Sequence, residues 1–217
     1  TYWNTASFLS LYGRLADWTP GDPVAPVAER PVLDRWVISE LHRVIAAVDE
    51  AMDAFDPART GALLTDFVDV LSNWYVRRSR RRFWDGDPAA LATLHECVRS
   101  LTLLMAPLVP FVTEKVWQAL VRPSEPDAPL SVHLASFPMP NPALLDDGLA
   151  YVKEGDKICA DGVVIEGGQF LLDESILTGE SEPVDKHDAG TFRANEQKLL
   201  LAEAGELHVL RLVALVL

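Results

Sequence analysis

The sequence predicts a mainly α-helical chain, in which an antiparallel helical bundle is followed by a short β segment. Apolar residues recur at helical spacing in several segments before residue 122. Asp56-Pro57 and Asp87-Pro88 each place an N-cap residue before proline, the pattern that starts a helix. After residue 150 short apolar runs alternate with turn pairs such as Gly167-Gly168, which is typical of strands.

The first two helices are predicted from their apolar faces. Residues 1–15 form one helix, and residues 17–31, which contain four prolines, form an extended connector. Residues 33–55 form the second helix, with an inward face and an outward face. The inward residues are Val37, Leu41, Val44, Val48, Met52 and Phe55, and the outward residues are Arg35, His42, Arg43 and Glu50.

Three further helices follow. A long central helix runs from Asp56-Pro57 to about Trp84, another from Asp87-Pro88 to about Met105, and a last one covers residues 111–121. Short connections between long amphipathic helices make neighbours antiparallel, which predicts an up-and-down bundle. Its expected core contains Val37, Leu41, Val44, Leu64, Phe67, Leu71, Leu101, Leu104 and Trp117.

Residues 73–84 carry five arginines and four aromatic residues, although the whole chain has a net charge of -13. On an uninterrupted helix, Arg78, Arg81 and Arg82 continue the apolar arc of the preceding turns, and Arg77 lies at its edge. Arg80 lies on the solvent arc. One interpretation is a solvated helix end whose arginines cover neighbouring apolar surface. The other is a contact with a polyanion, because guanidinium groups pair with phosphates and stack on bases.

Composition limits the remaining possibilities. The acidic balance argues against indiscriminate coating of nucleic acid or of an anionic membrane. Cys97 and Cys159 show no metal-ligand spacing, and we expect a reducing cytoplasmic setting with no metal and no cofactor. The longest apolar run, residues 209–217, is shorter than the roughly 20 residues that span a bilayer, so no membrane helix is expected.

Residues 1–149 resemble the anticodon-binding helical domain of bacterial isoleucyl-tRNA synthetase, a class I synthetase. The resemblance rests on Tyr2-Trp3-Asn4-Thr5, on residues 73–84, and on residues 105–111 followed by Glu114. It implies a domain that docks on isoleucine tRNA and orients it for aminoacylation. The signatures of the synthetase catalytic site are absent, so no activity is expected from this chain alone. The residues expected to bind tRNA are Asn73, Trp74, Arg77, Arg78, Arg81, Arg82 and Trp84.

Residues 151–190 resemble part of the actuator domain of P-type cation-transporting ATPases, through Gly155-Asp156-Lys157-Ile158 and the run 173–184. In that family the glutamate matching Glu180 activates water against an aspartyl-phosphate. The alternative function is therefore an actuator fragment, or a composite chain with no intact activity. Residues 191–217 match neither family. Within them, residues 195–203 could be helical, and residues 207–217 could form a strand or a helix.

Overall fold

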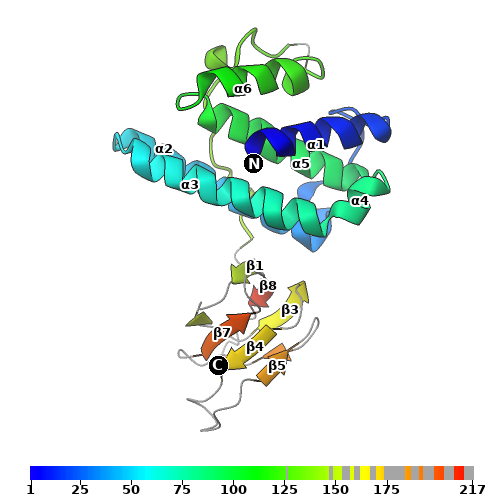
Figure 1. Ribbon diagram of the computed structural model, residues 1–217, viewed down its shortest axis with the longest axis vertical. Helices are drawn as coiled ribbons and strands as arrows, with labels where there is room; N and C mark the ends of the chain where they lie inside the picture. The colour runs from blue at the N-terminus through cyan, green and yellow to red at the C-terminus, as the bar shows by residue number, and fades with distance from the viewer. Residues whose placement is uncertain are drawn as a thin grey trace. The chain divides into compact units, whose positions relative to one another are not determined.

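The chain divides into two compact units, Thr1–Leu145 and Asp146–Leu217. The computed structural model describes residues 1–125 and 127–146, and beyond them it describes only strands (Figure 1).

The first unit is helical throughout its regular structure. Six α-helices are α1 (Tyr2–Leu15), α2 (Val32–Asp53), α3 (Pro57–Asp69), α4 (Arg80–Trp84), α5 (Pro88–Met105) and α6 (Pro110–Val116). Two π-helical segments are η2 (Val70–Val76) and η3 (Trp117–Val121), and three 3-10 turns are η1 (Val27–Glu29), η4 (Val132–Leu134) and η5 (Pro142–Leu144). The prediction of a helical bundle is confirmed for this unit.

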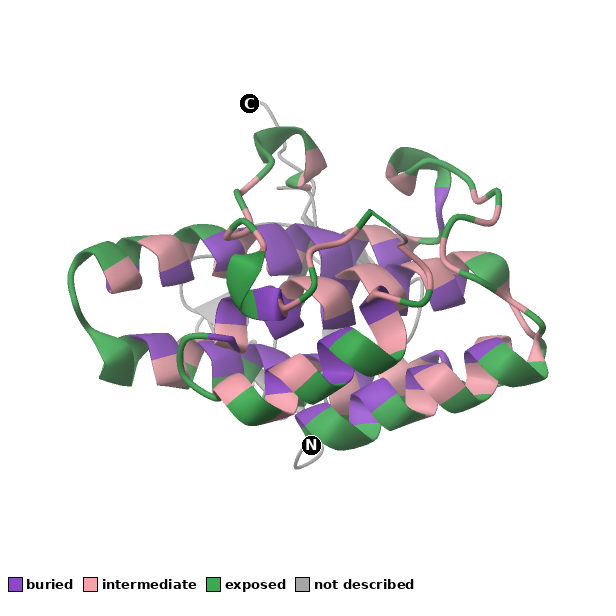
Figure 2. Cartoon of the chain, turned by 90° about the horizontal axis from the view of Figure 1, so that it is seen from above, coloured by how far each residue is buried: buried purple, intermediate pink, exposed green. Residues whose placement is uncertain are grey.

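Helix α5 is the centre of the bundle, because it contacts α1, α2, α3, α4 and α6. Figure 1 shows α2 and α3 side by side as one layer, with α1 and α5 beside it. Buried residues follow the inward sides of these helices (Figure 2). The predicted core is confirmed except at Val44, which is only half-buried because Ile45 occupies the inward position beside it. The confirmed residues are Val37, Leu41, Leu64, Phe67, Leu71, Leu101, Leu104 and Trp117.

The predicted helix starts are also confirmed. Asp56 Oδ1 accepts a hydrogen bond of 2.9 Å from the Arg59 amide, and Asp87 Oδ1 accepts one of 2.8 Å from the Ala89 amide. Each carboxylate satisfies an amide that lacks a partner within its own helix.

Phe55 and His42 lie on the opposite side of the bundle surface from the one predicted: Phe55 is exposed and His42 is buried. Phe55 is 92% exposed because α2 ends at Asp53 and Phe55 adopts a left-handed conformation, with φ of 55°, in the turn to α3. His42 is buried because the segment around η5 covers this side of α2, and its Nδ1 accepts a 3.1 Å hydrogen bond from the Asn141 amide. Burial lowers the pKa of His42.

In the second unit, the residues that the structure describes form eight strands: β1 (Leu149–Val152), β2 (Lys157–Ile158), β3 (Gly162–Glu166), β4 (Phe170–Asp173), β5 (Val184–Lys186), β6 (Thr191–Phe192), β7 (Lys198–Ala202) and β8 (His208–Leu212). They form two four-stranded sheets with the orders β1-β8-β3-β6 and β2-β7-β4-β5. All of the pairings are antiparallel; Val163 is opposite Arg211, for example, and Leu171 is opposite Leu201.

Candidate nucleic-acid interface

The arginine-rich stretch begins inside the π-helical segment η2. An i→i+5 turn holds one residue more than an α-turn, so it rotates later side chains by about 100° relative to an uninterrupted α-helix. Within η2, Trp74 is 5% exposed and Tyr75 is 0% exposed, so two consecutive aromatic side chains both reach the core. The predicted faces of the following arginines assumed a regular α-helix, and the one that differs in the structure is that of Arg81, which is exposed.

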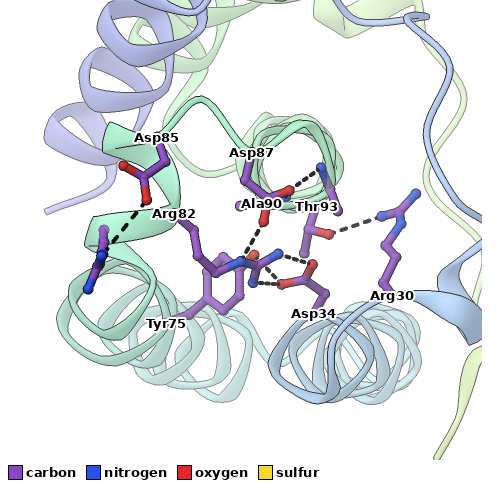
Figure 3. Close-up of polar contacts among 10 residues, drawn as sticks. Arg30, Asp34, Tyr75, Arg82, Asp85, Asp87, Ala90 and Thr93 are labelled. Carbon is purple, nitrogen blue, oxygen red and sulfur yellow. Dashed lines mark hydrogen bonds and ion pairs between the residues drawn. The ribbon is translucent and has the colours of Figure 1, made fainter.

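Arg82 is held inside the unit by two carboxylates (Figure 3). Its Nη1 and Nη2 donate to Asp34 Oδ1 and Oδ2 at 2.6 and 2.8 Å, and its Nε donates to Asp87 Oδ2 at 2.7 Å. Asp34 is 0% exposed and also accepts a 2.8 Å hydrogen bond from the Tyr75 hydroxyl. One guanidinium thus ties α4 to the first turn of α2 and to the N-cap of α5.

Hydrogen bonds and neighbouring charges keep Arg82 and Asp87 in their charged forms. Burial alone would lower the pKa of Arg82, but the hydrogen bonds and charge of Asp34 outweigh burial and raise it. Burial alone would raise the pKa of Asp87, but the bond from Arg82 and the amides of Ala89 and Ala90 lower it. Burial, together with the neighbouring Asp34 carboxylate, raises the pKa of Tyr75 well above its ordinary value. Tyr75 therefore remains a neutral donor.

Arg82 is among the residues expected to bind tRNA, but its guanidinium group is already occupied within the unit. Its side chain is 24% exposed, and all three of its nitrogens donate to carboxylates. Buried ion pairs with this bidentate geometry resist separation, because breaking them leaves an uncompensated charge. Arg82 is a structural residue that fixes the arginine-bearing helix.

The surface that remains open consists of Asn73, Arg77, Arg80, Arg81 and Trp84, all of which are exposed. We call these five residues the arginine face. Within the part of the chain that the structure describes, Arg77 and Arg80 make no ion pair. Arg81 has a side chain that is 93% exposed and lies 3.8 Å from Asp85, a distance at which an exposed pair contributes little. Their guanidinium groups are available to an external anion.

Arg81 was predicted on the inward arc and Arg80 on the solvent arc, but both are exposed. The physical reason is the extra residue of η2 together with the break at Ser79, which separates η2 from α4. The predicted contrast between these two arginines is therefore wrong.

Trp74 and Arg78 form the inner edge of the arginine face. Trp74 packs against the buried Trp36 ring at 4.5 Å between centroids, and the half-buried Arg78 guanidinium lies 5.7 Å from the Trp74 ring. This corrects the prediction for Trp74, because a residue that is 5% exposed has no surface for a base. Arg78, in contrast, is oriented by a cation–π contact at the edge of the open surface.

Asp34 is the functional residue that sequence analysis missed. It lies four residues before the buried Ile38 and so falls on the apolar face of α2. A carboxylate on an apolar face signals a buried partner, because an unpaired buried charge is costly. The sequence could have revealed the burial of Asp34, but not which arginine pairs with it.

Three further predictions concern Glu180, metal binding and a membrane helix. Glu180 lies outside the described residues. In residues 1–125 and 127–146, no three His, Cys, Asp or Glu side chains gather as a metal site. Within the same residues, no helix has both the length and the apolarity to cross a membrane.

The helical unit thus presents exposed arginines of the kind that pair with phosphates. The family model for the anticodon-binding domain of tRNA ligases matches residues 34–161, and this chain belongs to that family. The family model for the P-type ATPase actuator domain also matches, over residues 143–207.

The chain is similar to curated isoleucine–tRNA ligases. It is 57% identical over 150 residues to that of Streptomyces coelicolor, which covers 69% of this chain and 14% of the relative. It is 55% identical over 159 residues to the enzyme of Thermobifida fusca, and 43% identical over 155 residues to that of Thermus thermophilus. Each of these matches covers 69% of this chain and 15% of the relative. The chain therefore spans about a seventh of the length of these relatives.

Proposed function

We propose that the helical unit binds isoleucine tRNA as the anticodon-binding part of an isoleucyl-tRNA synthetase, and presents it to an active site carried by other parts of that enzyme. The observation that carries this proposal is the arginine face. Arg80 and Arg81 project from α4, which Arg82 ties to two neighbours, and Arg77 follows η2 directly. Guanidinium groups that are open to solvent suit phosphate, which accepts two parallel hydrogen bonds from one arginine.

Local charge matters here more than the net charge of the chain. Five of the 19 basic residues lie within residues 77–82, and all five are arginine. One of them, Arg82, is neutralised internally by Asp34 and Asp87, so the outward field comes from the remaining four. A cluster of this kind concentrates a polyanion at one surface even when the whole molecule is acidic.

The test is a titration of the whole chain with isoleucine tRNA at several salt concentrations. We expect the logarithm of the binding constant to fall linearly with the logarithm of salt, by about 0.7–0.9 for each phosphate neutralised. Three or four contacts would give a slope of about -2 to -4. The absence of any complex at low salt would refute the proposal.

We also propose that this docking needs no cofactor and takes place in the cytoplasm. Cys97 is a buried free thiol, and burial raises its pKa well above the ordinary value, so the thiol stays protonated and unreactive. This state fits a reducing compartment.

A separate proposal concerns the chain after residue 150. We propose that residues 151–190 are a short β fragment of actuator type with no hydrolytic activity, joined to the synthetase-like unit in a composite chain. The actuator model match over residues 143–207 and the short strands β3, β4 and β5 support it. The sequence as given contains no Asp-Lys-Thr-Gly-Thr phosphorylation motif to supply an aspartyl-phosphate.

Acetyl phosphate, an acyl phosphate like aspartyl-phosphate, tests this second proposal. We expect the chain to release phosphate from it no faster than an equal concentration of albumin does. A clear rate that disappears in Glu180→Gln would instead assign water activation to this glutamate.

A further inference from the structure

Trp84 combines an exposed side chain with a rigid backbone. Its indole is 78% exposed at the end of α4. Phe83, the residue before it, is 1% exposed and contacts the Phe8 ring at 5.2 Å and the Tyr75 ring at 6.3 Å between centroids. Arg82 is fixed by Asp34 and Asp87. The chain on the N-terminal side of Trp84 is therefore anchored at two consecutive residues.

The neighbours of Trp84 separate it from two aromatic residues that are more exposed than it is. Phe55 and Phe111 are also exposed, at 92% and 90%, but neither has an arginine three or four residues before it. Arg80 and Arg81 precede Trp84 by four and three residues on the same helical turn. Residues at these spacings are neighbours on a helix surface, and helical side chains lean towards the N-terminus. Arg80 and Arg81 thus lie on the same side of α4 as Trp84.

This combination fits one kind of ligand. An indole face offers base stacking, and adjacent guanidinium groups neutralise the phosphates on either side of a stacked base. In duplex RNA both faces of a base are covered by its neighbours, whereas bases in a loop can be splayed out onto an aromatic side chain. An arginine face without an aromatic platform would not distinguish the two forms.

Building on the proposed function, we propose that Trp84 is a stacking platform for an unpaired RNA base, with Arg80 and Arg81 holding the flanking phosphates. The arginine face then selects single-stranded loop RNA over duplex RNA. Trp84 acts by direct contact with the base, and Arg82 acts only by fixing the helix that presents it.

The experiment uses the whole chain and three RNA probes: a stem-loop, the same stem-loop with abasic loop positions, and a blunt duplex of equal charge. The variants are Trp84→Leu, which removes the ring, Trp84→Phe, which keeps a smaller ring, and the control Phe111→Leu. We expect Trp84→Leu to weaken stem-loop binding by about 5- to 150-fold, the range of base–aromatic stacking. Trp84→Phe should lose less, and Phe111→Leu should bind like the unaltered chain.

The abasic probe isolates stacking from charge. The unaltered chain and Trp84→Leu should bind it equally, with the same salt slope, because no base is present to stack. Since Trp84 is exposed, the melting temperature of Trp84→Leu should match that of the unaltered chain. Equal stem-loop affinity for the unaltered chain, Trp84→Leu and Trp84→Phe would overturn this inference alone. Failure of the unaltered chain to bind any of the probes would overturn the proposed function as well.

Discussion

Asp34→Ala is expected to destabilise the helical unit by about 3–5 kcal/mol, the usual cost of removing one partner of a buried ion pair. Asp34 is 0% exposed and accepts hydrogen bonds from Arg82 Nη1, Arg82 Nη2 and the Tyr75 hydroxyl. Without its carboxylate the guanidinium keeps only Asp87, and the Tyr75 hydroxyl loses its acceptor in the core. Urea denaturation monitored by circular dichroism measures the change.

Two comparisons make this prediction specific to the ion pair. Asp66→Ala removes an exposed aspartate from α3 and should change stability by no more than about 0.5 kcal/mol. The double variant Asp34→Leu with Arg82→Met should be less destabilised than the two single changes combined, because removing both charges leaves neither one buried alone. If Asp34→Ala unfolds at the same urea concentration as the unaltered chain, Arg82 is not clamped in solution.

The second large effect is on RNA binding. Arg77→Ala, Arg80→Ala and Arg81→Ala together should weaken binding of isoleucine tRNA at low salt by on the order of 10- to 1000-fold, since one hydrogen bond contributes about 0.5–1.5 kcal/mol net. The salt slope should fall by about 1 for each arginine. Stability should change little, because all three side chains are exposed. Fluorescence anisotropy with labelled tRNA at several salt concentrations measures both quantities.

A triple variant of equal charge change provides the control. Arg14→Ala, Arg59→Ala and Arg122→Ala remove three arginines outside the arginine face, of which Arg59 pairs only with the exposed Glu50 and Arg122 bonds Gln118. If binding depends on the arginine face, this control should retain most of its affinity. Equal losses in the two triple variants would mean that binding responds to net charge rather than to a located surface.

The helical bundle was predictable because its signals are local. Asp56 and Asp87 cap their helices through backbone amides two or three residues later. Buried apolar residues recur at helical spacing from Leu64 to Leu71. Such features depend on neighbouring residues only, so sequence alone determines them. The prediction fails at Phe55. The helical period placed this residue in the core, but it lies beyond the end of the helix in a left-handed turn.

The candidate site was predictable in location but not in detail. The density of arginines marked residues 73–84, but the π-helical segment η2 and the break at Ser79 moved Arg81 away from the face that a regular helix would give it. No local pattern announced that shift. The partner of Arg82 is 48 residues away in α2, so the division between one structural arginine and the exposed ones depends on tertiary packing.

The division between the structural Arg82 and the exposed arginines is measured most directly by NMR of the arginine Nε–Hε groups. The unaltered chain is titrated with isoleucine tRNA. The resonances of Arg77, Arg80 and Arg81 should shift as tRNA is added and recover as salt is raised, because their guanidinium groups gain and lose phosphate partners. The Arg82 resonance should stay in place throughout, since its Nε already donates to Asp87 at 2.7 Å in the free chain. A large shift of Arg82, or no shift of the three exposed arginines in the presence of a tRNA complex, would contradict the assignment of the arginine face as the tRNA-binding surface.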